Sequence, residues 1–298
     1  MNESSLEDKK NRLSWILSLE GLEGIGRIST RKVVKAFPTY STLLNMPYEQ
    51  AFIRLKGVAN RENLIRKLKD RAFFEPVLAA VYDHVSRLFE MRVDVVSWDT
   101  PTWPVRLEAI EGNPKPNILY GYGNIALLNQ PLIGLFGRPN LEANHFELAQ
   151  DVVRFLLQED LTLMTGLETG FDTVVHKICS TSGRPSVMWA SSGLARISNN
   201  IRSQAMASVR QGGVMVSSFP MQHGLYKHDE FERAKLVAAA AQVCLFTQPE
   251  ARTPEYHALE LAVQLNKPVF GIMHQEIEGV QPIASEDDFP SIQAALKI

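Results

Sequence analysis

The sequence predicts an α/β protein, with a three-layer Rossmann-like domain and a mostly parallel sheet at 91–298, preceded by a small all-helical domain at 1–90. From Val93 onward, short apolar segments alternate with helical segments of ten or more residues, which is typical of βαβ units. Before that point the apolar spacing is helical almost throughout. The charge divides at the same place, since the first ninety residues hold 15 Lys and Arg against 11 Asp and Glu, whereas the remainder holds 16 against 22.

The individual elements follow this division. We expect the main helices of the first part at Leu13–Leu19, Thr30–Phe37, Glu62–Lys69 and Phe73–Phe89. We expect strands at Val93–Trp98, Leu132–Phe136, Leu161–Met164, Ser186–Trp189, Val214–Ser217, Val243–Phe246 and Val269–Ile272, with a proline-rich crossing segment at Pro101–Pro116 that ends in Asn117–Tyr120. The intervening helices are expected at Glu142–Gln158, Asp172–Thr181, Asn199–Arg210, Glu230–Ala240 and Glu255–Leu265.

The composition is that of a globular protein with a core. Hydrophobic residues make up 45% and charged residues 21% of the chain, which excludes a disordered chain, a collagen-like fibre and a disulfide-stapled mini-protein. The net charge of −2 excludes a histone-like protein but permits a local basic groove. Cys179 and Cys244 lie in apolar stretches, so we expect reduced core thiols. Because the N-terminus has no secretory apolar region and the run Leu236–Phe246 is too short for a bilayer, we expect a cytoplasmic protein without membrane contact.

Candidate binding residues lie directly after the predicted strands. Ligands of an open parallel sheet bind beyond the carboxyl ends of its strands, where helix N-termini present backbone N–H groups. The corresponding loops are Gly137–Asn140, Thr165–His176, Ser191–Gly193, Ser217–Pro220 and Thr247–Thr253.

The loop Thr165–His176 carries the richest pattern. Gly166 and Gly170 allow a ligand to approach the backbone, Asp172 is placed to cap the next helix, and His176 shares its face. This arrangement suits an anion such as a phosphate or a nucleotide. A glycine-rich turn whose Asp and His serve only the turn is the other interpretation.

A second glycine-rich segment, Gly21-Leu-Glu-Gly-Ile-Gly26, enters a predicted helix. Such a turn is typical of helix-hairpin-helix modules, whose backbone N–H groups hold a DNA phosphate. It is equally typical of a tight helix–helix turn in which glycine supplies φ > 0.

Several segments together resemble the DprA/Smf family, the DNA-processing proteins within the SMF/LOG-type Rossmann superfamily. The loop Thr165-Gly-Leu-Glu-Thr-Gly-Phe-Asp-Thr-Val-Val-His176 resembles the family's Ser-Gly-x-Ala-x-Gly-Ile-Asp-x-x-Ala-His signature. Further segments follow in family order, namely Leu19–Gly26, Trp103–Leu107, Asn113–Gly123, Ile133–Gly137, Gly213–Pro220 and Phe231–Ala238. The resemblance covers roughly residues 11–275 and implies the family's fold.

The sequence also departs from the family pattern. The family's Gly-Ser-Arg loop is Gly137-Arg138-Pro139 here, and its Arg-Asn-Arg element is Arg233-Ala234-Lys235. Ser218 and Thr247 replace acidic positions, and the family's Ser-Gly-x-x-x-Thr-Ala loop becomes Arg252–His257. Because the sequence ends at Ile298, we expect a divergent member that lacks the family's C-terminal winged helix.

The resemblance implies a protein that binds single-stranded DNA in a basic pocket, forms a homodimer through the Rossmann-like domain and passes the strand to the RecA recombinase. The residues expected to bind phosphates are Gly137, Arg138, Gly166, Gly170, Asp172, His176, Lys177, Arg202, Arg233, Lys235 and Arg252. Seven of them are expected to surround one groove, namely Gly137, Arg138, Gly166, Gly170, Lys177, Arg233 and Lys235. Each cation taken alone is also typical of a solvated surface. The helix Glu255–Leu265 is a candidate for the dimer surface or for packing on its own sheet.

Two other functions stay open. Motif-eroded relatives of this kind serve as antitoxin or sensor partners of a toxic enzyme in phage-defence modules. The LOG branch consists of phosphoribohydrolases that cleave nucleoside monophosphates, but its Pro-Gly-Gly-x-Gly-Thr-x-x-Glu loop is matched only by Pro249–Thr253, without glycines. We find no catalytic carboxylate pair, nucleophile elbow or Cys/His metal pattern, and therefore expect a non-enzymatic protein without catalytic residues, metal or cofactor.

Overall fold

The computed structural model describes residues 3–112, 115–138 and 140–296 of the 298-residue chain. Asn113 and Pro114 of the family-like segment, Pro139 of the Gly137–Asn140 loop and the terminal Ile298 lie outside the described residues. No helix in the described part is long and apolar enough to cross a membrane.

Six helices precede the first strand. They are α1 (Glu3–Glu20), α2 (Arg27–Ala36), α3 (Tyr40–Leu44), α4 (Tyr48–Arg54), α5 (Arg61–Lys69) and α6 (Arg71–Glu90). The four helices expected from periodicity are all present. The short helices α3 and α4 were not expected, because five and seven residues are too few to show a helical period.

One nine-stranded sheet follows. Its strands are β1 (Val93–Ser97), β2 (Ile118–Gly123), β3 (Leu132–Gly137), β4 (Thr162–Gly166), β5 (Ser186–Trp189), β6 (Val214–Ser217), β7 (Val243–Thr247), β8 (Val269–Ile272) and β9 (Gln281–Pro282). Their order is β1-β2-β6-β5-β4-β3-β7-β8-β9. β2 pairs antiparallel with β1 and β6, and the other neighbours pair in parallel. The seven expected strands and the mostly parallel pairing are confirmed, whereas β2 and the two-residue β9 were not expected as strands.

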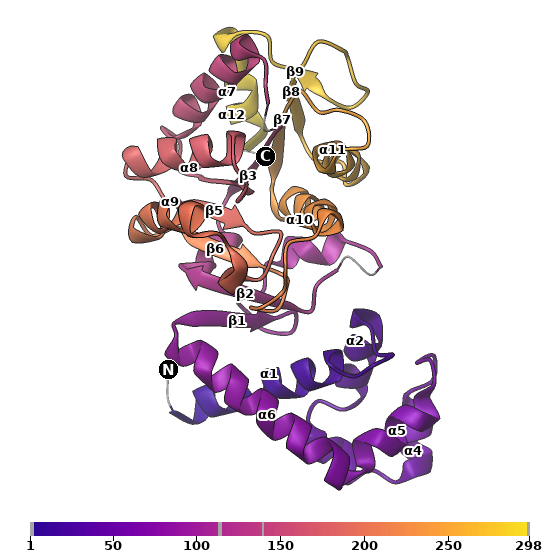
Figure 1. Cartoon of the computed structure of the whole chain (residues 1–298). Coiled ribbons are helices and arrows are strands. Elements are labelled where there is room, and N and C mark those ends of the chain that lie inside the picture. Colours follow the sequence, from indigo (N-terminus) through magenta and orange to yellow (C-terminus); the bar gives the residue numbers. More distant parts are fainter. Residues whose placement is uncertain (1–2, 113–114, 139, 297–298) are drawn as a thin grey trace.

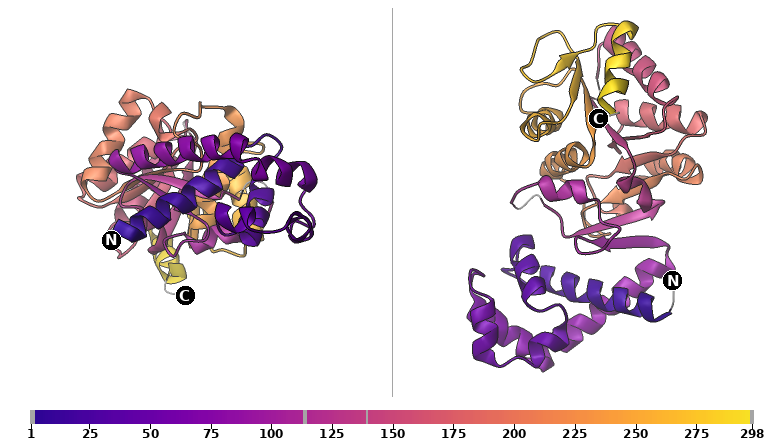
Figure 2. Two further views of the ribbon diagram at one scale, coloured as in Figure 1. Left: turned by 90° about the horizontal axis from the view of Figure 1, so that it is seen from below. Right: turned by 180° about the vertical axis from the view of Figure 1, so that it is seen from behind.

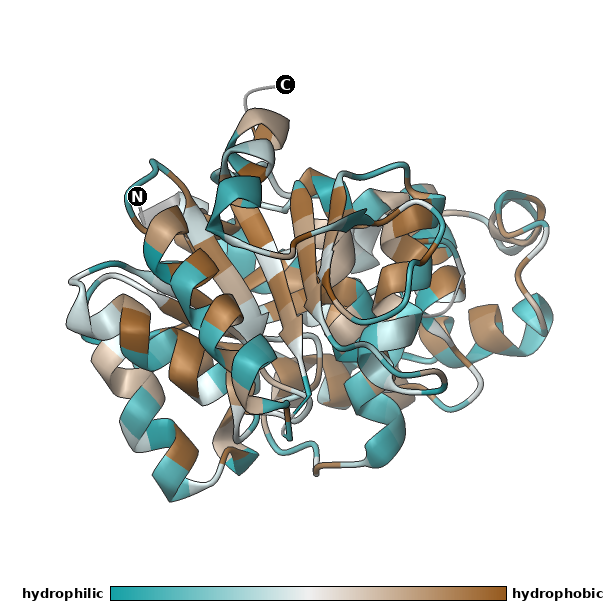
Figure 3. Ribbon diagram, turned by 90° about the horizontal axis from the view of Figure 1, so that it is seen from above, coloured by the Kyte–Doolittle hydropathy of each residue, from teal (hydrophilic) through white to brown (hydrophobic). Residues whose placement is uncertain are grey.

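Helices cover both faces of this sheet, which confirms the three-layer architecture (Figure 1). One face carries α7 (Ala143–Leu156), α8 (Phe171–Thr181), α9 (Asn199–Arg210) and α12 (Phe289–Leu296), and the other carries α10 (Lys227–Ala240) and α11 (Pro254–Gln264). The inner strands are hydrophobic along their length, whereas the outer helices alternate between hydrophobic and hydrophilic stripes (Figure 3). Short 3-10 helices complete the chain at Val105–Ala109, Ile125–Asn129, Leu194–Arg196 and Glu286–Asp288.

Both cysteines belong to the core, as expected. Cys179 and Cys244 are free, buried thiols, and burial raises the pKa of each to about 12. Both thiols are therefore protonated and unreactive near neutral pH.

The N-terminal helices pack against the antiparallel edge of the sheet, below β1 in Figure 1 and below the sheet in the right view of Figure 2. In the left view of Figure 2, seen from below, they lie in front of the sheet. A single apolar cluster runs from Trp15 and Phe74 of the helices through Val95 of β1 and Tyr120 of β2 to Met215 of β6. The helices before residue 90 therefore share a continuous core with the sheet.

Polar contacts reinforce this junction, and Arg31 of α2 makes most of them. Its guanidinium donates to Glu108 at 2.8 and 3.1 Å, to the Asn117 side chain at 2.6 Å and to the Pro116 carbonyl at 2.8 Å. The same group lies 5.1 Å from the centre of the Trp98 ring. Asn117 in turn donates to Glu20 at the end of α1.

The Gly21–Gly26 turn joins α1 to α2 beside this junction. Gly24 has φ +83°, so the turn uses the backbone freedom of glycine. Arg27, directly after the turn, forms an ion pair of 2.8 Å with Glu232 of α10. Phosphate binding at this turn stays a prediction.

Replacing Arg31 by alanine is expected to lower the free energy of unfolding by about 2 kcal/mol, because several partly buried hydrogen bonds of a charged group are lost. Urea denaturation measures this change. The matched control is Arg71→Ala, since Arg71 forms an exposed ion pair with Glu75 on α6, and its loss is expected to change the free energy of unfolding much less. Equal losses for the two variants would contradict the role given to Arg31.

Candidate nucleic-acid interface

The loops after β3, β4 and β7 and the first half of α10 meet at the carboxyl edge of the sheet. They enclose a pocket of about 280 Å³. Its lining residues are Gly137, Arg138, Glu168, Thr169, Asp172, Glu230, Arg233, Thr253, Pro254 and Glu255. The pocket thus combines two arginines with four carboxylates, and sequence reasoning had identified only Arg138, Arg233 and Asp172 among these charges.

Arg233 forms the inner wall of this pocket. It lies on α10 and is 5% exposed, and its Nε donates to the Ser191 hydroxyl at 3.4 Å. Its guanidinium packs directly on the backbone of Gly166, where a Cβ atom would lie 2.5 Å from Nη1. The expectation that Arg233 is a surface cation is wrong, because the helix turns it inward onto the end of β4.

Two carboxyl groups beside Arg233 are partly shielded from water. Burial raises the pKa of Glu168, although the Arg233 charge and a 2.8 Å hydrogen bond from Ser191 oppose this shift. Burial also raises the pKa of Glu255, again against the Arg233 charge. Arg233 therefore balances acidic groups of its own chain, which weakens its attraction for an external phosphate.

Asp172 braces the loop before α8 and does not cap that helix as expected. Its carboxylate accepts the Thr165 hydroxyl at 2.6 Å and the Glu168 backbone N–H at 3.1 Å. The residue before the first turn is Gly170, whose φ is +90° and which supplies no side-chain cap. The correction follows from position, because Asp172 is already inside α8 and reaches backward into the loop.

The glycines of the predicted groove make room for side chains of this protein. A Cβ atom on Gly137 would lie 2.5 Å from the Phe171 ring, and one on Gly166 would lie 2.4 Å from the Asp172 carboxylate. The expectation that these backbones face a phosphate is wrong at Gly137 and Gly166, since Phe171, Asp172 and Arg233 occupy that space.

His176 is a buried cross-link between elements. Its Nε2 pairs with the Gly166 carbonyl at 2.8 Å and its Nδ1 with the Ser186 hydroxyl at 3.0 Å. Burial lowers the pKa of the imidazole, so it is neutral near pH 7. His176 joins α8 to β4 and β5 and does not face a ligand, contrary to the expected role.

The other predicted cations are dispersed. Arg138 reaches the pocket and pairs with Glu250, and Arg252 is exposed on the same β7–α11 loop as Glu250. Arg202 donates to the Leu194 carbonyl at 2.8 Å and holds the loop before α9. Lys177 is exposed on α8, and Lys235 lines a different hollow beside α11. Of the seven residues expected around one groove, the structure brings Gly137, Arg138 and Arg233 to this pocket, with Gly166 packed against Arg233. Lys177 and Lys235 lie outside it.

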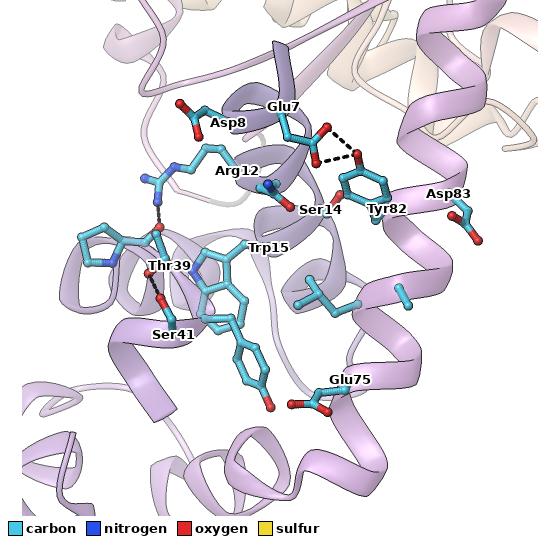
Figure 4. A pocket seen from close by; sticks show the side chains of 15 residues that line it. Glu7, Asp8, Arg12, Ser14, Trp15, Thr39, Ser41, Glu75, Tyr82 and Asp83 are labelled. Atoms are coloured by element: carbon cyan, nitrogen blue, oxygen red, sulfur yellow. Dashed lines mark hydrogen bonds between the residues drawn. The ribbon is translucent and has the colours of Figure 1, made fainter. Parts of the chain in front are cut away.

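A larger groove of about 950 Å³ lies between α1, α3 and α6 (Figure 4). Trp15 forms its wall, and the four carboxylates of its lining are Glu7, Asp8, Glu75 and Asp83. The arginine of the lining, Arg12, is engaged by Asp99 and by the Pro38 carbonyl. The carboxyl edge of the sheet has as many carboxylates but two arginines, and it lies where open parallel sheets bind ligands, so it is the better candidate for DNA.

The comparisons with known proteins agree with this architecture. The family model described as DNA recombination-mediator protein A matches residues 94–283, which span the sheet from β1 to β9. The chain therefore belongs to the family of DNA recombination-mediator proteins A. A comparison with curated protein sequences finds no match.

Two solved structures share the fold. DNA processing protein A (DprA) from Streptococcus pneumoniae matches with a TM-score of 0.68 and 18% identity, over 93% of this chain and 97% of that chain. DNA processing protein A from Helicobacter pylori, described with a single-stranded DNA binding mode, matches with a TM-score of 0.57 and 18% identity, over 69% of this chain and 96% of that chain.

The variant Arg233→Gln is expected to lower the free energy of unfolding by about 3 kcal/mol, because it removes a buried cation that faces partly buried carboxyl groups. The matched control is Lys235→Gln, two residues along the same helix and only partly buried, with an expected change within about 0.5 kcal/mol. Urea unfolding of both variants measures the difference. A stable Arg233→Gln protein would contradict the interior role of this guanidinium.

Stability should also depend on pH through His176. Its pKa is lowered in the folded chain, so below about pH 6.5 the unfolded chain binds a proton that the folded chain refuses. The free energy of unfolding therefore falls as the pH falls from about 7.5 to 5.5 on account of this group.

In His176→Gln that fall should be shallower, by up to about 1.4 kcal/mol per pH unit. Glu168 and Glu255, whose pKa values are raised, act in the opposite sense but equally in both proteins, so the difference isolates His176. Urea unfolding at the two pH values tests this, and identical slopes would contradict it.

Proposed function

We propose that this protein binds single-stranded DNA as a non-enzymatic recombination mediator. The single observation that carries the proposal is the family match over residues 94–283. The single-stranded DNA binding mode of the structurally similar protein from Helicobacter pylori supports the same ligand.

The proposed contact surface is the rim of the carboxyl edge, with Arg138 and Arg252 as its phosphate-binding residues. Arg138 is partly exposed, and its buried Nε lacks a hydrogen-bond partner among the described residues. Its ion-pair partner Glu250 keeps 63% side-chain exposure, so a phosphate can replace that carboxylate while Glu250 returns to water at little cost. Arg233, Asp172 and the glycines shape this rim from below.

The test is fluorescence anisotropy with labelled oligothymidylate, titrated at several salt concentrations. The double variant Arg138→Gln with Arg252→Gln should bind more weakly and should flatten the slope of log affinity against log salt by about 1.4, since each phosphate contact to a single strand contributes about 0.7. Labelled duplex DNA serves as the comparison ligand.

The matched control is Lys235→Gln with Lys177→Gln, which removes two predicted cations that lie away from the pocket. This control is expected to keep the parental affinity and slope. If the control loses binding and the arginine variant does not, the strand lies along the helices instead. If the parent binds no single-stranded DNA, the proposed function fails.

Partners beyond DNA are proposed on the family alone. Homodimerisation, delivery of the strand to RecA and a toxin partner in phage defence each stay predictions. For the dimer, α11 offers little apolar surface, because Leu259 and Ala262 pack on the sheet of their own chain while Leu261 and Leu265 are partly buried. Light scattering at micromolar concentration tests the dimer, and a monomer mass would reject it.

A second candidate function is the binding or cleavage of a nucleotide at the same pocket. It is favoured by Glu168 and Glu255, whose pKa values are raised by burial beside two arginines. Incubation with nucleoside monophosphates, followed by chromatography for released base and ribose phosphate, tests it. Absence of both products with a folded protein would reject cleavage.

A further inference from the structure

One carboxylate and two imidazoles converge at the carboxyl edge, beside the pocket described above. Glu142 precedes α7 and His145 lies in its first turn, while His274 follows β8. Because β7 lies between β3 and β8 in the sheet, the loops after these three strands are neighbours (Figure 1). Residues far apart in the sequence are thereby brought together.

The three side chains stand at the spacing of metal ligands. Oε2 of Glu142 is 3.0 Å from Nε2 of His274 and 3.8 Å from Nδ1 of His145. One ligand atom from each residue lies within 4.8 Å of the other two. Two ligands of a tetrahedral ion with bonds of about 2.0–2.1 Å are separated by roughly 3.4 Å, so small rotations complete the geometry.

The buried member of the cluster has an unused nitrogen. His145 is 9% exposed, and its Nδ1 is inaccessible to water without a hydrogen-bond partner in the described structure. Buried polar atoms are almost always paired, so this nitrogen, directed at the Glu142 carboxylate and His274, calls for a ligand.

Neighbouring groups hold the three residues in place. The Glu142 backbone N–H donates to the Gln248 side chain at 3.0 Å, and the Gln248 backbone N–H donates to the Ile272 carbonyl at 2.9 Å. The rings of His145 and His274 meet edge to face, with their centres 4.3 Å apart. The loop ends of β7 and β8 therefore preorganise the cluster, as metal sites require.

We propose that Glu142, His145 and His274 bind one divalent transition-metal ion of the Zn²⁺ class. Two imidazole nitrogens and one carboxylate oxygen suit Zn²⁺, whereas Mg²⁺ and Ca²⁺ prefer oxygen ligands alone. The site revises the expectation that the chain holds no metal. That expectation was based on the absence of a Cys/His pattern in the sequence. It did not include Glu142-x-x-His145 at the start of a helix together with His274 after a distant strand.

The fourth coordination position faces an adjoining pocket of about 590 Å³. Glu142 and His274 contribute to its lining, together with Arg138, Gln248 and Tyr256. Water or an anionic oxygen fits this position, because the Arg138 guanidinium supplies a second contact for an anion. The metal site stands independently of the proposed DNA function.

Isothermal titration calorimetry of the chelator-treated full chain with ZnCl₂ tests the proposal. One saturable site per chain is expected. His274→Gln changes an exposed residue and should leave the fold intact. His274→Gln and Glu142→Gln, each made alone, should weaken Zn²⁺ binding by at least about 100-fold. Titration with Co²⁺ should give visible absorption bands in the parent that both variants lose, whereas MgCl₂ should give no binding heat at this site.

The matched control is His257→Gln. His257 and Glu260 on α11 also form a His–Glu pair three residues apart, with 3.1 Å between Nδ1 and Oε2, but no third ligand joins them within the described residues. This control should keep parental Zn²⁺ affinity. Any of three results would overturn the proposal: a parent without a saturable site, parental affinity in both Glu142→Gln and His274→Gln, or loss of binding in His257→Gln.

Discussion

The ends of β3 and β4 and the loop after β7 meet around one buried guanidinium, that of Arg233. Its position decides how tightly these elements approach, because Gly166 must lack a side chain where Arg233 and Asp172 press on it. The Arg233 charge also favours the ionised forms of Glu168 and Glu255, which are partly buried beside it. A cation in this position stabilises the edge of the sheet and shapes the pocket. In the proposed function, external anions bind to the arginines of the rim instead.

The rim and the interior therefore have different tasks. Arg138 and Arg252 lie at positions from which a phosphate can compete with an exposed carboxylate, whereas Arg233 has no comparable freedom. On the far side of Arg138, Glu142, His145 and His274 form a second polar cluster. This member of the recombination-mediator family thus shares the fold of its relatives and places both sets of charged residues at the edge where such folds bind ligands.

The helical region and the sheet depend on one another. The core that begins at Trp15 continues through β1 and β2, and Arg31 closes the junction with four hydrogen bonds. Some of the excess basic residues among the first ninety, such as Arg31, form internal contacts of this kind. This explains why a count of charges indicated little about a DNA-binding face.

Local periodicity was enough to determine the fold. Strands such as Ser186–Trp189 and helices such as Asn199–Arg210 appear at the expected bounds, because a strand buried on both faces and an amphipathic helix each impose their own spacing. The order of the strands in the sheet places the loops after β3, β4 and β7 side by side. Tertiary packing alone decided which way each polar side chain turned, so that Arg233 and His176 became interior groups and His145 met a distant His274. The orientation and burial of a side chain depend on neighbours from remote parts of the chain, and the spacing of residues along the sequence does not predict those neighbours.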